Sequence, residues 1–335
     1  MLQLPIQDTP ILALGDVNPD IILPLEPTGD TFPLQHHDDD LLRAHISGGG
    51  TVANVASGLG RLGIPVSFCG KTGDDAMGRL MKQLLEDDHV DTSRLLFESD
   101  GFTNMVFAVI HDDGERTIFV WPPSGAAQST IRQEDLTFDV SAYSLVHFSS
   151  INLHEDPSAN SILCFLSLHR SPPLVISFDM NLRREFFKRD KAFSARLNRS
   201  LALSDIIFGS ALEEIQPLTG ISDPVRAAQA LNPEACVIAR LGDEGALCIF
   251  QGESYHVPPY PIKVVDTLGA GDAFDSGFIA ALHKGKTLRQ ATSWGNACAA
   301  YSITCPNARS CPSYDALVTF VKRYHTTSEI EEIFL

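Results

Sequence analysis

The sequence predicts an α/β fold in which a doubly wound, mainly parallel sheet is flanked by helices and carries a small β-sheet lid. Short apolar or β-branched runs alternate with longer amphipathic stretches along most of the chain, which is typical of a parallel sheet covered on both faces. Two irregular insertions, at about 23–46 and 101–123, interrupt this alternation and are expected to form the lid. We therefore expect a single domain spanning residues 1–335.

The elements of the main sheet and its helices follow from hydrophobic periodicity. Buried strands are expected at 11–17, 66–69, 145–148, 174–178, 205–208 and 236–241. Helices are expected at 51–62, 75–87, 158–169, 191–204, 224–231, 270–284, 288–304 and 313–324.

The two insertions differ in character. The second has the pattern of a β-hairpin, with apolar residues of period two on either side of a turn-prone centre at 112–115. The first is rich in Pro and Asp, and its run of histidine and aspartate at 36–40 favours a solvated acidic loop over a metal site. The alternating residues of the hairpin are Met105, Phe107, Val109, Ile118 and Val120.

Composition excludes several classes of partner. The chain is 44% hydrophobic and 20% charged, and its formal net charge of −17 repels nucleic-acid phosphate and anionic membrane surfaces. Its seven cysteines are scattered without a CxxC pair, which favours free thiols in a reducing compartment. We find neither a signal-peptide pattern at the start nor an apolar run of membrane-spanning length. A cytoplasmic protein with small-molecule partners is expected.

The segment 264–274 has the features of an anion site. Gly269, Ala270 and Gly271 allow a ligand to approach the backbone closely, and a helix follows whose first N–H groups suit a phosphate. Asp272 lies in the same first turn, where a carboxylate either caps the helix or serves as a base beside the phosphate. A phosphate cradle with an adjacent carboxylate is what a kinase needs.

Two other glycine patterns carry less information. Residues 58–63 spell GxGxxG, but they follow a helical pattern and not a strand, so we interpret them as a helix end with Gly63 as its cap. The sequence contains no GxxxxGK[ST] motif, which excludes a P-loop enzyme.

Several of these segments together resemble the ribokinase (PfkB) family of carbohydrate kinases. Residues 266–274 with Ser276 and Gly277 resemble its C-terminal signature. The N-terminal signature is similar to 48–56, 63, 70–75 and 78, except that Val52 stands where a small residue or Pro is usual. Residues 15–20 resemble the end of the family's first strand, and 241–246 resemble its nucleotide-side turn.

The resemblance, which covers about residues 10–325, implies roles for individual residues. Asp272 matches the catalytic base, with Asp275 as the next carboxylate to test, and Gly269, Ala270 and Gly271 match the anion hole. The positions that match the sugar-binding residues are Asn18, Asp20, Gly49, Gly50 and Asn54. As alternatives, Asn18 and Asp20 are turn residues and Asn54 is a polar residue at a helix start.

The resemblance implies ATP and Mg²⁺ as cofactors, and it also allows a monovalent cation such as K⁺. Glu213 would organise Mg²⁺ through water, although Ser210 replaces the usual Asn of that motif. Asp179 and Arg183 would face the phosphates or the sugar, or form an ion pair at the strand end. The remaining nucleotide-side positions are Gly242, Gly245, Thr267 and Asn296, the last with helix packing as its alternative. Asp266 and Leu268 fit half of a cation site whose second half has Asn307 in place of glycine.

The leading functional hypothesis is an ATP-dependent kinase, fructokinase- or ribokinase-like, that phosphorylates a primary hydroxyl of a neutral sugar. Pro122 stands where sugar-acid kinases of the family have an arginine, and a buried unpaired carboxylate would be costly, so a sugar acid is disfavoured. The alternatives are a nucleoside kinase, with Trp121 as a stacking residue, and a non-catalytic sugar-binding protein. We also expect a homodimer through the lid, because family lids often dimerise and edge strands tend to find partners.

Overall fold

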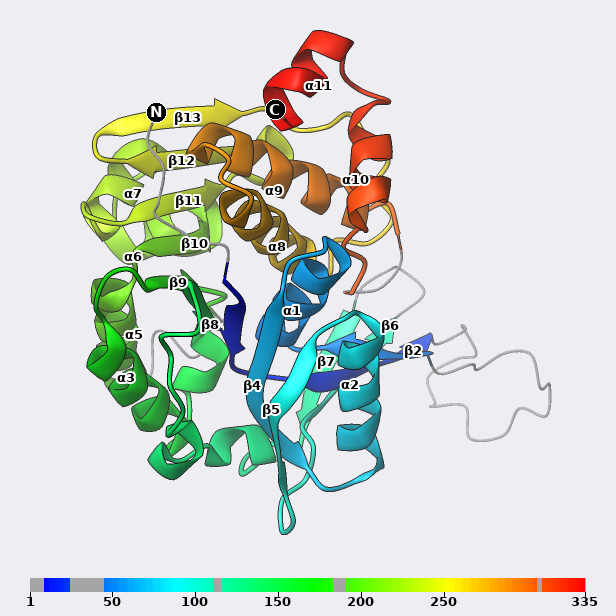
Figure 1. Cartoon of the computed structure of the whole chain (residues 1–335), viewed down its shortest axis with the longest axis vertical. Helices are drawn as coiled ribbons and strands as arrows, with labels where there is room; N and C mark the ends of the chain where they lie inside the picture. Colours follow the sequence, from blue (N-terminus) through cyan, green and yellow to red (C-terminus); the bar gives the residue numbers. More distant parts are fainter. Residues whose placement is uncertain (1–8, 25–44, 111–115, 183–190, 306–308, 335) are drawn as a thin grey trace, which may run out of the picture.

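The computed structural model describes residues 9–24, 45–110, 116–182, 191–305 and 309–334. Its centre is a nine-stranded sheet in the order β13-β12-β11-β10-β9-β8-β1-β4-β5, mainly parallel as predicted (Figure 1). The two strands at one edge, β12 and β13, run antiparallel to their neighbours. The strands are β1 (Ile11–Leu14), β4 (Val66–Gly73), β5 (Asp91–Glu98), β8 (Leu145–Ser149), β9 (Val175–Asp179), β10 (Ile206–Ser210), β11 (Cys236–Arg240), β12 (Ala246–Phe250) and β13 (Glu253–Val257).

Helices cover both faces of this sheet, and the two faces bury separate hydrophobic clusters. Alternate residues of β1 show this directly, because Ile11 and Ala13 enter one cluster and Leu12 and Leu14 enter the other. One face is covered by α1 (Thr51–Arg61), α2 (Ala76–Asp87), α8 (Ala270–His283), α9 (Leu288–Ser302) and α10 (Tyr314–Val321). The other is covered by α3 (Ser158–His169), α5 (Lys191–Leu203) and α7 (Pro224–Leu231). The short α6 (Gln216–Thr219) and the C-terminal α11 (Thr327–Phe334) complete the α-helices described.

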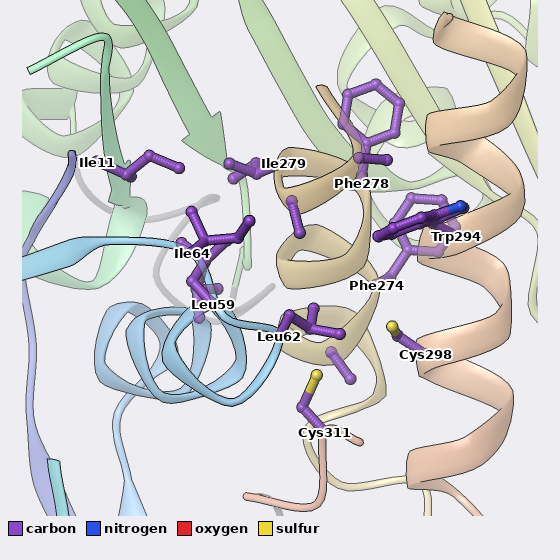
Figure 2. Close-up of a cluster of buried hydrophobic side chains, with 14 of the residues drawn as sticks. Ile11, Leu59, Leu62, Ile64, Phe274, Phe278, Ile279, Trp294, Cys298 and Cys311 are labelled. Carbon is purple, nitrogen blue, oxygen red and sulfur yellow. The ribbon is translucent and has the colours of Figure 1, made fainter. Parts of the chain in front are cut away.

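Helices α1, α8 and α9 pack closely, and this packing explains the glycine at position 58. Figure 2 shows Leu59 of α1, and Leu62 just after its end, on one side of α8, and Phe274 and Phe278 of α8 with Trp294 of α9 on the side toward α9. A Cβ on Gly58 would overlap Ser276 of α8, so the glycine lets the two helices touch. Gly63 follows the end of α1 with a φ of 75°, which confirms its predicted role as a helix cap.

The lid is a four-stranded sheet in the order β3-β2-β6-β7. Its strands are β2 (Asn18–Pro24), β3 (His45–Gly49), β6 (Met105–Ile110) and β7 (Arg116–Trp121). The predicted hairpin is confirmed, since β6 and β7 pair antiparallel with Met105 opposite Trp121. The predicted turn at 112–115 and the acidic run at 36–40 lie outside the described residues.

The lid's apolar residues are distributed differently from the prediction. The register places Phe107 opposite Phe119, whereas Ile118 pairs with Ala108 and Val120 pairs with Val106. Paired residues share a face, so Ile118 and Val120 lie on the face opposite to Phe107. The alternating residues Met105, Phe107, Val109, Ile118 and Val120 therefore do not form one apolar face, because the register offsets β7 by one residue relative to that pattern.

Hydrogen bonds at the base of the hairpin connect the lid to the main sheet. Thr103 donates from its N–H and its hydroxyl to the two carboxylate oxygens of Asp75, at 2.9 and 2.7 Å. Its hydroxyl also accepts from the N–H of Gly73 at 3.2 Å and contacts the hydroxyl of Thr72 at 3.0 Å. Asp75 at the same time caps α2 by accepting from the N–H of Gly78, so one carboxylate joins the helix start to the lid.

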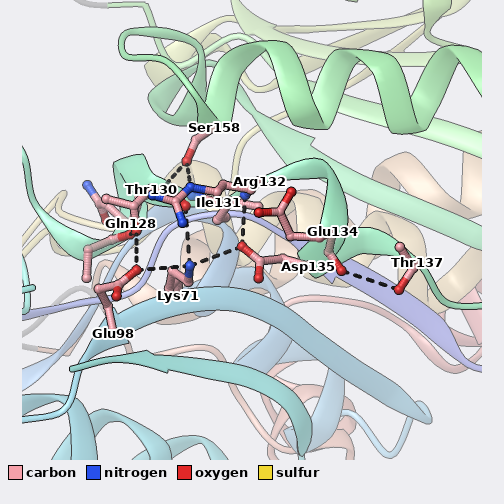
Figure 3. Close-up of polar contacts among 11 residues, drawn as sticks. Lys71, Glu98, Gln128, Thr130, Ile131, Arg132, Glu134, Asp135, Thr137 and Ser158 are labelled. Atoms are coloured by element: carbon pink, nitrogen blue, oxygen red, sulfur yellow. Dashed lines mark hydrogen bonds and ion pairs between the residues drawn. The ribbon is translucent and has the colours of Figure 1, made fainter. Parts of the chain in front are cut away.

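The buried Lys71 of β4 stabilises the same region (Figure 3). Its ammonium nitrogen lies 3.1 Å from a Glu98 oxygen and 3.0 Å from an Asp135 oxygen, and it donates to the Thr130 carbonyl at 3.3 Å. Two short 3₁₀ helices, η1 (Ala127–Thr130) and η2 (Gln133–Leu136), supply two of these partners. The ion-pair network therefore holds the segment after the lid hairpin against β4 and β5.

Several elements were not predicted from the sequence. They include β5, in which only Thr92 and Leu95 are buried, and the β12–β13 hairpin at the antiparallel edge. No helix in the described ranges is long and apolar enough to cross a membrane.

Candidate active site

The N-terminus of α8 presents unpaired N–H groups to the site. Gly269 precedes the helix with a φ of 74°, a left-handed conformation that glycine adopts without strain. The N–H groups of Gly271 and Asp272 belong to the first turn, where no intrahelical acceptor exists, and the helix dipole adds positive potential there. The Arg240 side chain lies against the Cα of Gly271, since a Cβ at that position would be 2.7 Å from Nη1. The arrangement suits a phosphoryl group.

Asp272 lies in this first turn and accepts a hydrogen bond from Nδ2 of Asn54, at 2.7 Å from its Oδ2. Burial raises the pKa of Asp272 to about 8, although the hydrogen bond from Asn54 opposes the shift. The nearby carboxylates of Asp179 and Asp16 raise it further and Arg240 lowers it. A carboxyl group with a pKa near neutrality is suited to proton transfer.

Residues at the start of α1 hold Asn54 in this position. The buried Asp16 accepts from the N–H groups of Thr51 at 2.7 Å and Val52 at 3.2 Å, and so caps the helix from the segment between β1 and β2. Gly50 has a φ of 92°, and a Cβ there would be 2.8 Å from the Asp16 carbonyl. Val52, which departs from the family signature, packs against Gly15, which has no side chain to obstruct it.

The predicted sugar-binding residues of the lid also come together. Asn18 and Asp20 are both buried on β2, and Nδ2 of Asn18 donates to Oδ1 of Asp20 at 2.8 Å. Gly49 of β3 faces the same carboxylate so closely that a Cβ would overlap it. Asn18, Asp20, Gly49, Gly50, Asn54 and Asp272 therefore surround one region between the lid, α1 and α8.

A charged cluster that the sequence did not reveal lies beneath the anion hole. Arg240 donates to Asp179 at 2.7 Å and to Asp275 at 3.1 Å, and both carboxylates are buried. Burial alone would lower the pKa of Arg240, but Asp179, Asp275 and Glu214 together raise it. The partner of Asp179 is therefore Arg240, whereas the predicted ion pair at the strand end involved Arg183, which lies outside the described residues. A lone arginine ending a buried strand was the signal that could have identified this cluster.

The carboxylates of Asp275 and of the Glu213 motif differ in burial. Asp275 is completely buried beside Arg240, and burial raises its pKa well above the usual range. Glu213 is exposed, and Ser210 accepts from its N–H at 3.2 Å, so the serine still caps this turn. The buried carboxylate of the motif is Glu214, whose pKa burial raises to about 7.

Three of the predicted nucleotide-side residues adjoin one loop. A Cβ on Gly245 would overlap the Val257 carbonyl, and Asn296 of α9 donates from Nδ2 to the Pro258 carbonyl at 2.6 Å. Gly242 begins the short 3₁₀ turn that Gly245 ends. Thr267 is exposed in the segment before α8, and its carbonyl accepts from Ala270. Arg183 lies outside the described residues.

The first half of the predicted cation site lies beside the end of α9. Asp266 accepts from the N–H of Leu268 at 2.9 Å. The N–H groups of Val265 and Asp266 both donate to the carbonyl of Ile303, at the end of α9. Asn307 of the second half lies outside the described residues.

A separate pocket of about 940 Å³ lies between β13, the α8–α9 loop and the C-terminal helices, and none of the predicted site residues lines it.

A family model for pfkB family carbohydrate kinases matches residues 28–315, which is most of the chain and includes the N-terminus of α8 with Asp272. The chain belongs to this family. This kinase is 33% identical over 237 residues to a fructokinase of Klebsiella pneumoniae, and the match covers 70% of this chain and 76% of that protein. It is 32% identical over 284 residues to the aminoimidazole riboside kinase of Salmonella typhimurium, covering 82% and 88%.

Solved structures agree with the family assignment. A fructokinase double mutant from Vibrio cholerae O395, with fructose, ADP and potassium ion bound, superposes with a TM-score of 0.78 and 28% identity, covering 94% of this kinase and 99% of that chain. The aminoimidazole riboside kinase of Salmonella enterica, complexed with aminoimidazole riboside and an ATP analog, gives a TM-score of 0.75 and 28% identity, covering 93% and 99%. The predicted ribokinase-like fold is confirmed.

Proposed function

We propose that this carbohydrate kinase transfers the γ-phosphoryl group of ATP to a primary hydroxyl of a neutral sugar, with Asp272 as the general base. The observation that carries the proposal is the position of Asp272. It lies between Asn54 of the sugar-binding stretch, 2.7 Å away, and the first-turn N–H groups of α8. The acceptor hydroxyl and the phosphoryl group would meet at this carboxylate.

The residues then have distinct tasks in the transfer. Asp272 takes the proton of the acceptor hydroxyl while the hydroxyl oxygen forms a bond to the γ-phosphorus. The bond between the γ-phosphorus and the β–γ bridging oxygen breaks, and ADP leaves. The N–H groups of Gly271 and Asp272 stabilise negative charge on the phosphoryl oxygens, and the Arg240 guanidinium beneath Gly271 adds a fixed positive charge. Asn54 holds the Asp272 carboxylate in place.

The residues present fit MgATP. Mg²⁺ usually keeps several waters and binds phosphate oxygens with one or two carboxylates, and the exposed Glu213 after β10 is available for such a role. Among the described residues, no group of three or more metal-binding side chains gathers. Bound Mg²⁺ would neutralise phosphate charge during the transfer. Asp266, Leu268 and the adjoining Ile303 support a monovalent cation site beside the anion hole.

The charges around the acceptor region favour a neutral substrate. Asp20 and Asp272 both border this region, and Pro122 gives no cation at the lid position where sugar-acid kinases have an arginine. An anionic sugar would therefore meet two carboxylates. We retain the neutral sugar as the proposed acceptor.

A nucleoside remains the second candidate, because the aminoimidazole riboside kinases are among the similar proteins. The role of Trp121 as a stacking residue for the acceptor is disfavoured, however. The register pairs Trp121 with Met105, whereas Val106 pairs with Asp20, so Trp121 lies on the opposite face of the lid from Asp20. A non-catalytic protein would need neither the raised pKa of Asp272 nor the open first turn of α8.

The homodimer through the lid is proposed on the exposure of β7, the strand at the edge of the lid sheet. The neighbouring side chains Ile118, Phe119, Val120 and Trp121 are each more than 40% exposed. An exposed apolar edge strand tends to pair with another chain, and a second copy would cover it. The cytoplasmic location stays a prediction.

ATP consumption measured over a panel of neutral sugars, sugar acids and nucleosides tests the proposal. We expect turnover with a neutral ketohexose or pentose. Efficient turnover of 2-keto-3-deoxygluconate with neutral sugars and nucleosides inert would contradict the neutral acceptor, and no ATP consumption with any compound would contradict the kinase activity itself.

A further inference from the structure

Arg309 contacts the catalytic region although its position in the sequence gives no sign of this. It belongs to the linker between α9 and α10, yet its Nε lies 3.3 Å from Oδ1 of Asn54 and its Nη2 lies 3.2 Å from the carbonyl oxygen of Gly49. One guanidinium therefore joins the α9–α10 linker to the first turn of α1 and to lid strand β3.

The guanidinium lies behind the acceptor region and not inside it. A Cβ on Gly49 would overlap Asp20, whereas a Cβ on the preceding residue, Gly48, would overlap the Arg309 guanidinium. Successive residues of a strand face opposite sides, so Arg309 and Asp20 lie on opposite faces of β3. Arg309 is thus placed to support the acceptor side from the rear.

The contact with Arg309 fixes which way the Asn54 amide is turned. A guanidinium has only donors, so the atom of Asn54 that faces it must be the oxygen. The amide nitrogen then necessarily faces Asp272, to which it donates at 2.7 Å. The reversed amide would set two donors against each other at Arg309 and two acceptors against each other at Asp272. The orientation therefore follows from chemistry as well as from the coordinates.

The charge of Arg309 also bears on Asp272. Burial lowers the pKa of Arg309 to about 10, while Asp88, Asp20 and Asp272 oppose the shift, so the side chain stays protonated at neutral pH. Its Nη1 is buried and has no hydrogen-bond partner among the described residues. A buried, incompletely paired guanidinium costs stability, which favours a functional reason for keeping it. Other charged groups also act on Asp272, namely Asp16, Asp179, Arg240 and Asp275. Arg61 in turn acts on Arg309.

We propose that Arg309 is a positioning residue that turns the Asn54 amide toward Asp272 and so favours the ionised, proton-accepting form of the Asp272 carboxylate. The inference rests on the proposed role of Asp272 as the base. Arg309 does not touch the reacting atoms and acts through Asn54, and its second bond, to Gly49, holds β3 against α1 at the same time.

The test is a titration of Asp272 in the free protein, followed by the ¹³C shift of its carboxyl carbon and assigned by the signal missing from Asp272→Asn. We expect a midpoint near 8 in the unaltered protein. Arg309→Met removes the positive charge and the guanidinium that orients the Asn54 amide. It should therefore raise this midpoint by on the order of one pH unit. Arg309→Lys keeps the charge but lacks the planar fork, so it should shift the midpoint less in the same direction.

Two further variants make the result specific. Arg61→Met removes a cation at the end of the same helix as Asn54, 3.8 Å from Asp88, and should leave the midpoint unchanged. In an Asn54→Ala background, Arg309→Met should move the midpoint much less, because the amide that transmits its effect is gone. An unchanged midpoint in Arg309→Met would overturn the proposal, as would equal shifts with and without Asn54. If Arg309→Met does not fold, an unchanged midpoint in Arg309→Lys has the same meaning.

The titration needs no substrate, so its outcome is separable from the proposed function. Failure of the base role would instead appear as high turnover in Asp272→Asn, whatever the midpoints are.

Discussion

At the scale of single residues, environment decides what each carboxylate does. Asp272 and Asp275 are one helical turn apart on α8, yet only Asp272 borders the acceptor region, while Asp275 is fully buried against Arg240. Asp16 and Asp75 use their oxygens to accept backbone N–H groups and so cap helices. The same side chain thus forms a proposed base, an ion-pair partner or a cap according to its neighbours.

Asp272→Asn is expected to reduce kcat by about 10²- to 10⁴-fold, because a positioned base contributes roughly that factor. The substitution keeps the size of the side chain and an oxygen that accepts from Asn54, so the fold and nucleotide binding should be retained. Steady-state kinetics and nucleotide titration of the purified variant provide the measurement. A folded variant with more than about a tenth of the original kcat would show that Asp272 is not the base.

The same substitution should stabilise the protein, with a definite pH dependence. The pKa of Asp272 is raised from 3.8 to about 8 on folding, so the stability that this group contributes is present below pH 3.8 and is lost as the pH rises to about 8. Asparagine does not ionise and avoids this loss. Denaturant unfolding should show equal stability near pH 4 and a variant more stable by on the order of a few kcal/mol at pH 8. A gain of the same size at both pH values would show that ionisation is not its cause.

The site could be predicted from the sequence where its residues lie in compact motifs, and not where they come from single positions elsewhere. Asn18, Asp20, Asn54 and Asp272 each stand in a segment of small and polar residues next to a strand or helix. Arg240, Glu214 and Arg309 stand in ordinary surroundings, and only the packing of distant elements gives them partners. Their roles depend on tertiary contacts that no local pattern encodes.

At the scale of elements, parallel strands and amphipathic helices were predicted well because their periodicity reports burial on one or both faces. Strand β5 was missed because only two of its eight residues, Thr92 and Leu95, are buried, and their spacing is not that of a strand with one buried face. In the lid, the hairpin was predicted correctly, but its register depends on turn geometry, which a pattern of period two does not fix.

The approach of β3 to β2 gives a prediction at this scale. Gly49→Ala would place a Cβ against the Asp20 carboxylate, so either the strand or the side chain must shift. We expect the KM for the acceptor sugar to rise about tenfold with a smaller change in kcat, since overpacking of this kind costs roughly 1–3 kcal/mol. Gly63→Ala is the matched control, because its Cβ would meet no atom within 4 Å. It should lower stability and leave KM unchanged, and a KM effect of equal size in both variants would contradict the argument.

At the scale of the whole molecule, the fold separates a rigid base from a lid. Helices α1 and α8 pack on the main sheet and carry Asn54 and Asp272, while β2 and β3 of the lid carry Asn18, Asp20 and Gly49 (Figure 1). The Thr103–Asp75 contacts connect the two parts at one point, and Arg309 connects them at another. The acceptor region is therefore complete only when the lid sheet holds its place against α1.

The exposed edge of that lid leads to a prediction about assembly. Light scattering at micromolar concentration should give twice the chain mass of 36.5 kDa. Phe119 and Ile118 are 47% and 46% exposed and lie on opposite faces of β7, so Phe119→Asp and Ile118→Asp show which face the second copy covers. A charge buried in an interface is costly, so the variant on the covered face should be monomeric.

Leu168→Asp, on α3 and outside the lid, is the control: leucine there is 81% exposed, and the variant should remain dimeric. A monomeric mass for the unaltered protein would contradict the dimer, and a dimer that survives both lid substitutions would place its interface elsewhere.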